Sequence, residues 1–270
     1  MSEPLKQKEF FLNQEFLTDP EARSLRILSE YIGPRLRFQE NQIADTIVFF
    51  GSARIPTPDQ ARADLEAAAE DIPVAEKRKL EQNLANSVYN EKCRKLAYKL
   101  THWSKNLKNS DHRYIITSGG GPGIMRAANK GASEAKGLSI GLNITLPFEQ
   151  SSNPYITTDL DIQFHYFFMR KFWMAYLAKA LVAFPGGFGT LDELMEILTL
   201  IQTRKISKKI PIVLFGKTFW KKVINWNYLV EIGTINEEDL DLFTITDSVD
   251  TAFRFITKSI SKSDFKGPNF

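Results

Sequence analysis

The sequence has 270 residues, of which 43% are hydrophobic, so it is long enough to bury one large core. Its 35 basic and 32 acidic residues give a net charge of +3, which lacks the strongly basic character of nucleic-acid-binding proteins. A single cysteine, Cys93, excludes an intramolecular disulfide framework. The polar start MSEPLKQKEF is unlike a signal peptide, and no apolar run approaches the ~18 residues of a membrane span. We therefore expect a cytoplasmic protein that binds neither nucleic acid nor membranes.

The first part of the chain is expected to be mostly helical. Residues 1–40 mix charge, aromatic residues and helix formers, which predicts an N-terminal helical extension with an amphipathic helix over 24–32. A buried strand is predicted at 46–50, where TIVFF is closed by a glycine. The charged, alanine-rich stretch at about 55–80 indicates a helical insertion, and a longer helix is predicted over 74–106.

Strands and helices alternate along the rest of the chain. Strands are predicted at 114–118, 138–144, 160–168, 180–184, 210–215 and 242–246. Helices are predicted at 123–135, 168–179, 191–202, 219–231 and 249–261. Because the strands are almost continuously apolar, this order predicts a Rossmann-like, doubly wound α/β fold with a mainly parallel sheet of about seven strands. The domain would span 41–262, with residues 263–270 as a frayed C-terminal tail.

Glycine-rich turns follow several of these strands, at the edge where an open α/β sheet binds its ligands. They are FFGSAR at 49–54, SGGGPG at 118–123 and PGGFGT at 185–190. The N–H groups of a helix that begins at such a turn can bind an anion. The turns at 118–123 and 185–190 do not fit the dinucleotide-binding pattern G-x-G-x-x-G. GKT at 216–218 resembles the end of a P-loop, but the first glycine of that motif would fall at Pro211. A hydride-transfer enzyme is therefore disfavoured.

Two charged residues close to these turns allow more than one interpretation. Thr190 and Glu193 fit a capping box, T-x-x-E, at the start of a helix. Alternatively, Glu193 faces the ligand and acts on a part of it other than an anionic group. Arg170 lies on an otherwise apolar helix, and a buried arginine needs a partner, so it makes either a structural ion pair or a ligand contact.

Taken together, the motifs resemble those of the LONELY GUY (LOG) family of nucleoside 5′-monophosphate phosphoribohydrolases, which are often labelled possible lysine decarboxylases. PGGFGTLDE fits the family signature P-G-G-x-G-T-x-x-E. Further matches over about residues 45–215 are GSAR, SGGGPGIMRAANKGA, GLNITLPFEQSSNPY and Met169-Arg170-Lys171. The extension before residue 40 and the insertion at 55–80 are departures from the compact members of the family.

The resemblance implies that Arg170 and Glu193 are the catalytic pair and that the glycine loops bind phosphate and ribose. The substrate-binding residues that it implies are Gly51, Ser52, Arg54, Gly119, Gly120, Gly121, Gly123, Glu149, Met169, Lys171, Gly186, Gly187, Gly189 and Thr190. It also implies a homodimer or a higher homo-oligomer. We expect no cofactor and no metal, because three scattered histidines and one cysteine lack the spacing of metal ligands.

The reaction predicted from this resemblance is hydrolysis of the N-glycosidic bond of a nucleoside 5′-monophosphate, of the AMP or cytokinin riboside 5′-monophosphate type. The glycines would hold the phosphate, while Glu193 stabilises the positive charge that develops on the ribose. The alternative is a non-catalytic nucleotide or molybdenum-cofactor carrier, since such carriers resemble this family in fold and glycine signature. The presence of both Arg170 and Glu193 favours the enzyme. Lysine decarboxylation is a third interpretation, but nothing in the sequence identifies a pyridoxal site.

Overall fold

A computed structural model of the protein describes residues 9–69, 71–107, 113–147, 151–262 and 267–269. Within these residues, seven parallel strands form one sheet in the order β4-β3-β2-β1-β5-β6-β7. The strands are β1 (Thr46–Phe50), β2 (Ile115–Ser118), β3 (Ser139–Ile144), β4 (Asp161–Phe164), β5 (Ala178–Ala183), β6 (Ile212–Phe215) and β7 (Phe243–Thr246). Every residue of β1, β5 and β6 is buried. The predicted Rossmann-like α/β fold is confirmed.

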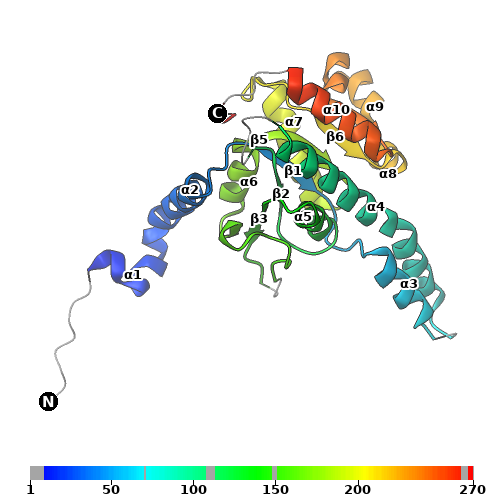
Figure 1. The fold of residues 1–270 in the computed structure, drawn as a ribbon, viewed down its shortest axis with the longest axis horizontal. Coiled ribbons are helices and arrows are strands. Elements are labelled where there is room, and N and C mark those ends of the chain that lie inside the picture. Colours follow the sequence, from blue (N-terminus) through cyan, green and yellow to red (C-terminus); the bar gives the residue numbers. More distant parts are fainter. Residues whose placement is uncertain (1–8, 70, 108–112, 148–150, 263–266, 270) are drawn as a thin grey trace.

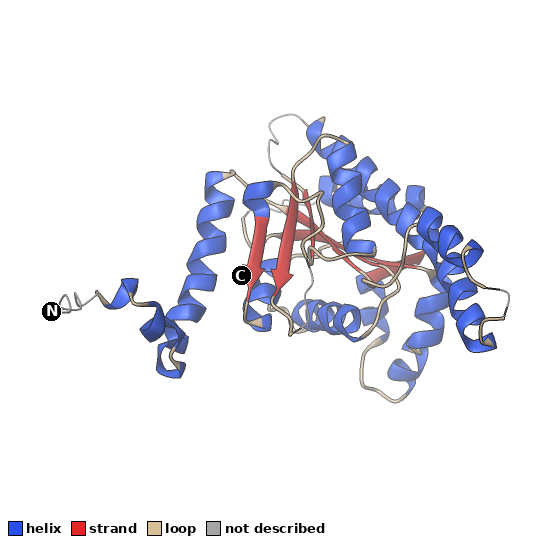
Figure 2. Ribbon diagram, turned by 90° about the horizontal axis from the view of Figure 1, so that it is seen from below, coloured by secondary structure: helices blue, strands red, loops and turns tan. Residues whose placement is uncertain are grey.

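Helices cover both faces of this sheet (Figures 1 and 2). They are α1 (Gln14–Thr18), α2 (Arg23–Glu40), α3 (Pro58–Glu66), α4 (Val74–Lys105), α5 (Ile124–Glu134), α6 (Phe167–Tyr176), α7 (Phe188–Gln202), α8 (Lys217–Val223), α9 (Trp226–Glu231) and α10 (Val249–Lys262). Short 3₁₀ helices are η1 (Phe10–Leu12), η2 (Pro20–Ala22), η3 (Thr158–Leu160) and η4 (Glu237–Leu242). None of the helices within the described residues is long and apolar enough to cross a membrane.

The strand order places these helices in two layers. The chain moves outward from β1 to β4 in one direction and from β5 to β7 in the other, so right-handed connections put α4 and α5 on one face and α6 and α7 on the opposite face. Helix α4 packs against α5 and α10 on one face, and α6 lies beside α7 on the other. Helices α1 and α2 project from the α6 side of the molecule, as Figure 1 shows.

Several predicted boundaries are wrong, and tertiary contacts explain the differences. The strand predicted over 160–168 ends at Phe164, because the backbone of Tyr166 already begins α6. The helix predicted over 168–179 ends at Tyr176, and Lys179 lies in β5, fully buried, with its Nζ 3.4 Å from Asp45 Oδ1. This ion pair allows a lysine to be buried near the amino end of the central strand β5.

Three more predictions need correction in detail. The helix predicted over 219–231 is two helices, α8 and α9, because the side chain of Asn225 caps a new helix by accepting a hydrogen bond from Tyr228 N. Helix α2 extends to Glu40 with Pro34 inside it. The tail is not frayed at Gly267–Asn269, since Asn269 Nδ2 donates to the carbonyls of Ala175 and Ala178, each at 2.7 Å. The division of the chain into domains stays a prediction.

Candidate active site

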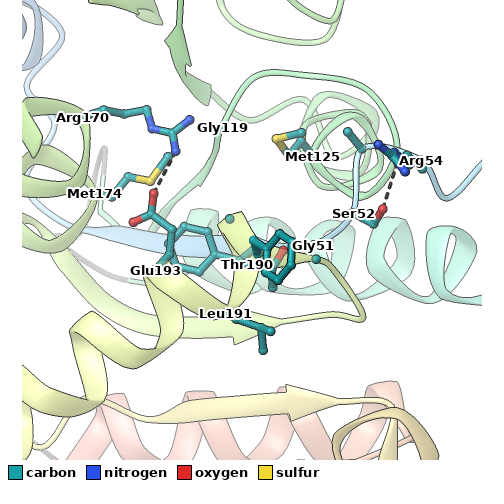
Figure 3. Close-up of a pocket in the computed structure, with 15 residues that line it drawn as sticks. Gly51, Ser52, Arg54, Gly119, Met125, Arg170, Met174, Thr190, Leu191 and Glu193 are labelled. Carbon is teal, nitrogen blue, oxygen red and sulfur yellow. Dashed lines mark hydrogen bonds and ion pairs between the residues drawn. The ribbon is translucent and has the colours of Figure 1, made fainter. Parts of the chain in front are cut away.

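The candidate site lies where β1 and β5 meet in the centre of the sheet. The strand order reverses between these two strands, and the carboxyl ends of strands at such a point form a crevice that binds ligands in α/β proteins. A cavity of about 650 Å³ opens there (Figure 3). Its lining residues are Phe50, Gly51, Ser52, Ala53, Arg54, Gly119, Met125, Arg170, Met174, Gly187, Phe188, Gly189, Thr190, Leu191 and Glu193.

An ion pair between α6 and α7 forms one wall of this cavity. Arg170 Nη2 donates a hydrogen bond to Glu193 Oε1 at 2.9 Å, and the two side chains are only 13% and 6% exposed. The Arg170 guanidinium also lies over the Phe167 ring, 5.1 Å from its centroid. Its buried Nε has no hydrogen-bond partner among the described residues. The arrangement therefore brings the two predicted catalytic residues together.

The charge of Glu193 is set by opposing influences. Burial raises the pKa of its carboxyl above the ordinary value of 4.5, while Arg170 and then Lys171 lower it. Lys171 itself pairs with two other carboxylates of α7, Asp192 at 2.7 Å and Glu196 at 3.1 Å. The contact between α6 and α7 thus includes three ion pairs, of which only Arg170–Glu193 lines the cavity.

The N-terminus of α7 faces the same cavity. Helix α7 begins at Phe188 with Gly187 as its N-cap, so no side chain satisfies the first N–H groups of the helix. Thr190 is already inside the first turn, and the Glu193 side chain bonds to Arg170. The capping-box interpretation of Thr190 and Glu193 is therefore wrong. The helix start remains available to an anionic ligand.

The glycines of the site are of two kinds. At Gly51, Gly123 and Gly186 an added Cβ would lie 2.1–2.5 Å from another atom, which belongs to the Ile124 side chain, the Ser52 backbone and the Thr190 side chain, respectively. At Gly187 and Gly189 an added Cβ would meet no atom within 4 Å. Close packing does not explain this second pair. A glycine inside a helix such as α7 costs roughly 0.5–1 kcal/mol relative to alanine, and the open space beside it suits a ligand.

The second glycine loop is held in place from behind the cavity. Asn153 Nδ2 donates to the carbonyl oxygens of Gly120 at 2.9 Å and Gly121 at 3.2 Å, and to Asn129 Oδ1 at 2.9 Å. Gly120 has φ +74°, and an added Cβ would collide with the Asn143 side chain. These buried amides keep the loop rigid, so that Gly119 reaches the cavity while the next two glycines have a structural role.

The predicted site residues consequently fall into two sets. Those that line the cavity are Gly51, Ser52, Arg54, Gly119, Arg170, Gly187, Gly189, Thr190 and Glu193. Those that do not line it are Gly120, Gly121, Gly123, Met169, Lys171 and Gly186. Glu149 lies outside the described residues.

The sequence did not predict the apolar residues that line the cavity. They are Phe50, Ala53, Met125, Met174, Phe188 and Leu191. Helical spacing could have found Met174, which follows Arg170 by four residues on α6 and so shares its face. Phe188 occupies the variable position of the glycine signature, and its identity alone gives no functional signal. Within the described residues, no group of three or more His, Cys, Asp or Glu side chains could hold a metal ion.

Comparison with known proteins supports the family resemblance. A family model described as "Possible lysine decarboxylase" matches residues 125–256, which contain Met169-Arg170-Lys171 and PGGFGTLDE. The match confirms the resemblance seen in the motifs over residues 125–256, which are slightly less than half of the chain. No curated protein matches the chain.

Similar solved structures cover most of the chain. One is the X-ray structure of TM1055, with 19% identity and a TM-score of 0.46, covering 79% of this chain and 99% of that one. Another is the molybdenum-cofactor (Moco) carrier protein from Chlamydomonas reinhardtii, with 19% identity and a TM-score of 0.43, covering 81% and 99%. A second structure of the carrier from that organism has 18% identity and a TM-score of 0.43, covering 80% and 98%.

The balance of charges predicts how the Glu193 carboxyl titrates. Its pKa should lie above 4.5 in the folded protein, and Arg170→Met should raise it further, because Arg170 is the largest influence that lowers it. Lys171→Met should cause a smaller rise. Carboxyl ¹³C NMR titration, with Glu193→Gln to assign the resonance, measures these values. An unchanged pKa in Arg170→Met would contradict the ion pair.

Proposed function

We propose that this protein hydrolyses the N-glycosidic bond of a nucleoside 5′-monophosphate to give the free base and ribose 5-phosphate. The proposal rests mainly on the buried Arg170–Glu193 pair, which lines the cavity together with the uncapped N-terminus of α7. The LOG-type family match is consistent with a nucleotide-related activity. An anion site and a buried carboxylate side by side suit a substrate that carries a phosphate at one end and develops positive charge elsewhere.

The phosphate is assigned to the start of α7. The start of α7 lines the cavity, an added Cβ at Gly187 or Gly189 would meet no atom within 4 Å, and the free N–H groups of a helix start bind anions. The Ser52 hydroxyl, which accepts a hydrogen bond from Arg54 N at 3.0 Å, lies in the same cavity. Helix N–H groups, a hydroxyl and an exposed arginine together can bind a phosphate from several sides.

The ribose then lies against Glu193. This residue follows Gly189 by four positions, so it is roughly 6 Å further along the axis of α7, at a rise of about 1.5 Å per residue. That separation is comparable to the distance from the 5′-phosphate to C1′ of a nucleotide. The base would lie toward Met125, Met174 and Phe188, which are apolar and suit a flat purine of the AMP or cytokinin type.

Glu193 has two tasks in the proposed reaction. As the C1′–N bond breaks, its carboxylate stabilises the positive charge that builds on the ribose. It also accepts a proton from the water whose oxygen forms the new bond to C1′. The bonding electrons go to the departing base, which takes up a proton from solvent, and Glu193 then releases its own proton to solvent. Arg170 favours the ionised form of Glu193, which its burial opposes, and holds its position.

The Glu193→Gln variant tests this mechanism. Turnover should fall roughly 10²–10³-fold, because the neutral amide neither stabilises the ribose charge nor accepts a proton, while nucleotide affinity changes little. Since only the ionised carboxylate is active, wild-type turnover should also decline as the pH falls through a Glu193 pKa that lies above 4.5. Chromatographic detection of free base from a panel of nucleoside 5′-monophosphates measures both effects.

Glu196→Gln is the matched control for this experiment. It removes the same charge from the same helix, but its carboxylate pairs with Lys171 and does not line the cavity. It should retain turnover close to that of the wild type. Equal losses in the two variants would argue against a catalytic role for Glu193. Tight nucleotide binding without release of base from any substrate would identify a carrier instead.

Gly189→Ala tests the assignment of the phosphate. The new methyl group would occupy the space kept open in the free protein, so affinity for a nucleoside 5′-monophosphate should fall roughly tenfold or more, and affinity for the nucleoside should not. The stability should be unchanged or increase by up to about 1 kcal/mol. Calorimetric titration measures the affinities, and urea denaturation measures the stability. Gly33→Ala on α2 is the control, because an added Cβ there also meets no atom within 4 Å. Unaltered monophosphate affinity would place the phosphate elsewhere.

We also propose that the protein is a homodimer whose interface lies beside the cavity. Phe167 and Phe168 at the start of α6 are 50% and 54% exposed, and Phe188 at the start of α7 is 93% exposed. Grouped exposed aromatic side chains are typical of protein interfaces. Sedimentation velocity should therefore show a dimer that Phe168→Ser together with Phe188→Ser weakens. A monomer at all concentrations would exclude it.

A further inference from the structure

The N-terminal helix α2 reaches the start of α6, the helix that carries Arg170. The Glu30 carboxylate accepts hydrogen bonds from two successive backbone groups there, His165 N at 2.7 Å and Tyr166 N at 3.2 Å. Tyr166 is the N-cap of α6, and its own side chain does not cap the helix. Glu30 thus satisfies donors at the helix start and places a negative charge at the positive end of its dipole.

Other contacts hold α2 along the same helix. Trp173 Nε1 of α6 donates to the backbone oxygen of Glu30 at 3.0 Å. The Tyr31 ring lies 5.6 Å from Phe172 and 5.9 Å from Trp173, and the Phe38 ring lies 5.4 Å from Trp173. These distances are typical of favourable aromatic pairs. Figure 1 shows α2 next to α6 and on the outside of the sheet.

Arg26 connects this contact to the rest of the N-terminal segment. Its Nε donates to the Tyr166 hydroxyl at 3.3 Å, and its Nη1 donates to the carbonyl oxygen of Leu17 at 2.7 Å, near the end of α1. The residue that caps α6 is therefore held through its backbone by Glu30 and through its side chain by Arg26.

The first turn of α6 determines where the Arg170 guanidinium lies. Arg170 is the fourth residue of the helix, and its backbone N–H donates to the carbonyl oxygen of Tyr166 at 3.2 Å. A shift of Tyr166 is therefore transmitted directly to Arg170. Catalytic groups tolerate little displacement, since a misplacement of about 1 Å can cost about 10²-fold in rate.

We propose that Glu30 is a positioning residue: by fixing the first turn of α6, it holds the Arg170 guanidinium against the Glu193 carboxylate. The expected effect of Glu30 on turnover rests on the proposed function. The expected effect of Glu30 on the Arg170–Glu193 geometry does not. It assigns the N-terminal helix a role in the active site, although no residue of α2 lines the cavity.

The test compares Glu30→Gln with Glu40→Gln. Glutamine keeps the shape of Glu30, but it replaces one acceptor oxygen with an NH₂ group that faces a backbone N–H. Glu40 is exposed at the end of the same helix, so its variant removes an equal charge without changing α6. Thermal unfolding of both variants verifies that they are folded.

The first readout does not depend on the reaction. The charged groups that act on Glu193 are Arg170 and Lys171 of α6 and Glu196 of α7. If Glu30→Gln displaces Arg170, the pKa of Glu193 measured by carboxyl NMR should rise, and Glu40→Gln should leave it unchanged. A folded Glu30→Gln protein with the wild-type Glu193 pKa would overturn the proposal.

The second readout is base release. Glu30→Gln should lower kcat roughly 10-fold or more with little change in KM, and Glu40→Gln should not. In an Arg170→Met background the same substitution should change kcat less than about twofold, because residues that act through one another are not additive. An equal loss in both backgrounds would overturn the proposal. If the wild type releases no base, the proposed function fails, and the NMR titration alone decides the role of Glu30.

Discussion

The buried ion pair between Arg170 and Glu193 is the interaction on which the candidate site depends. Taking two charges out of water is unfavourable, and removing one partner leaves the other charge uncompensated. The pair therefore requires two helices that come from different parts of the chain to be held in a fixed relation. Sheet topology supplies this condition, because the crossing from β4 to β5 brings α6 next to α7 at the central crevice. The N-terminal helix adds to it by fixing the start of α6.

This arrangement also has a cost for stability. The pKa of Glu193 is raised in the folded protein, so its carboxyl binds a proton more tightly there than in the unfolded protein. Its contribution to the free energy of unfolding therefore declines as the pH rises from the unfolded-state pKa to the folded-state pKa. Burial of Glu193 thus favours its neutral form, while Arg170 and Lys171 favour the ionised form. Such a residue is expected at a functional site more often than in a purely structural one.

A second buried ion pair, centred on Asp45, lies away from the cavity of the candidate site. Asp45 immediately before β1 pairs with Lys179 in β5 and with Arg113 just before β2. These residues lie at the amino ends of the strands, away from the edge where the helix N-termini converge. The same chemistry therefore has a structural role at one edge of the sheet and a proposed catalytic role at the other. Position relative to the strand ends, more than burial, distinguishes the two.

The sequence by itself determined the alternation of elements, the parallel sheet and the loops that surround the site, because apolar strands and glycine-rich turns are local patterns. It also singled out Arg170 and Glu193 through motifs that are short in sequence. Only the tertiary structure decided that Glu193 bonds to Arg170 and does not cap α7, since that choice depends on a partner 23 residues away. It likewise separated Gly187 and Gly189, which have open space beside them, from Gly51, Gly123 and Gly186, which allow loops to pack closely. The link from Glu30 to α6 spans 135 residues, and no local pattern predicts it, because a glutamate on a helix surface has the same sequence signature whether it faces water or another helix.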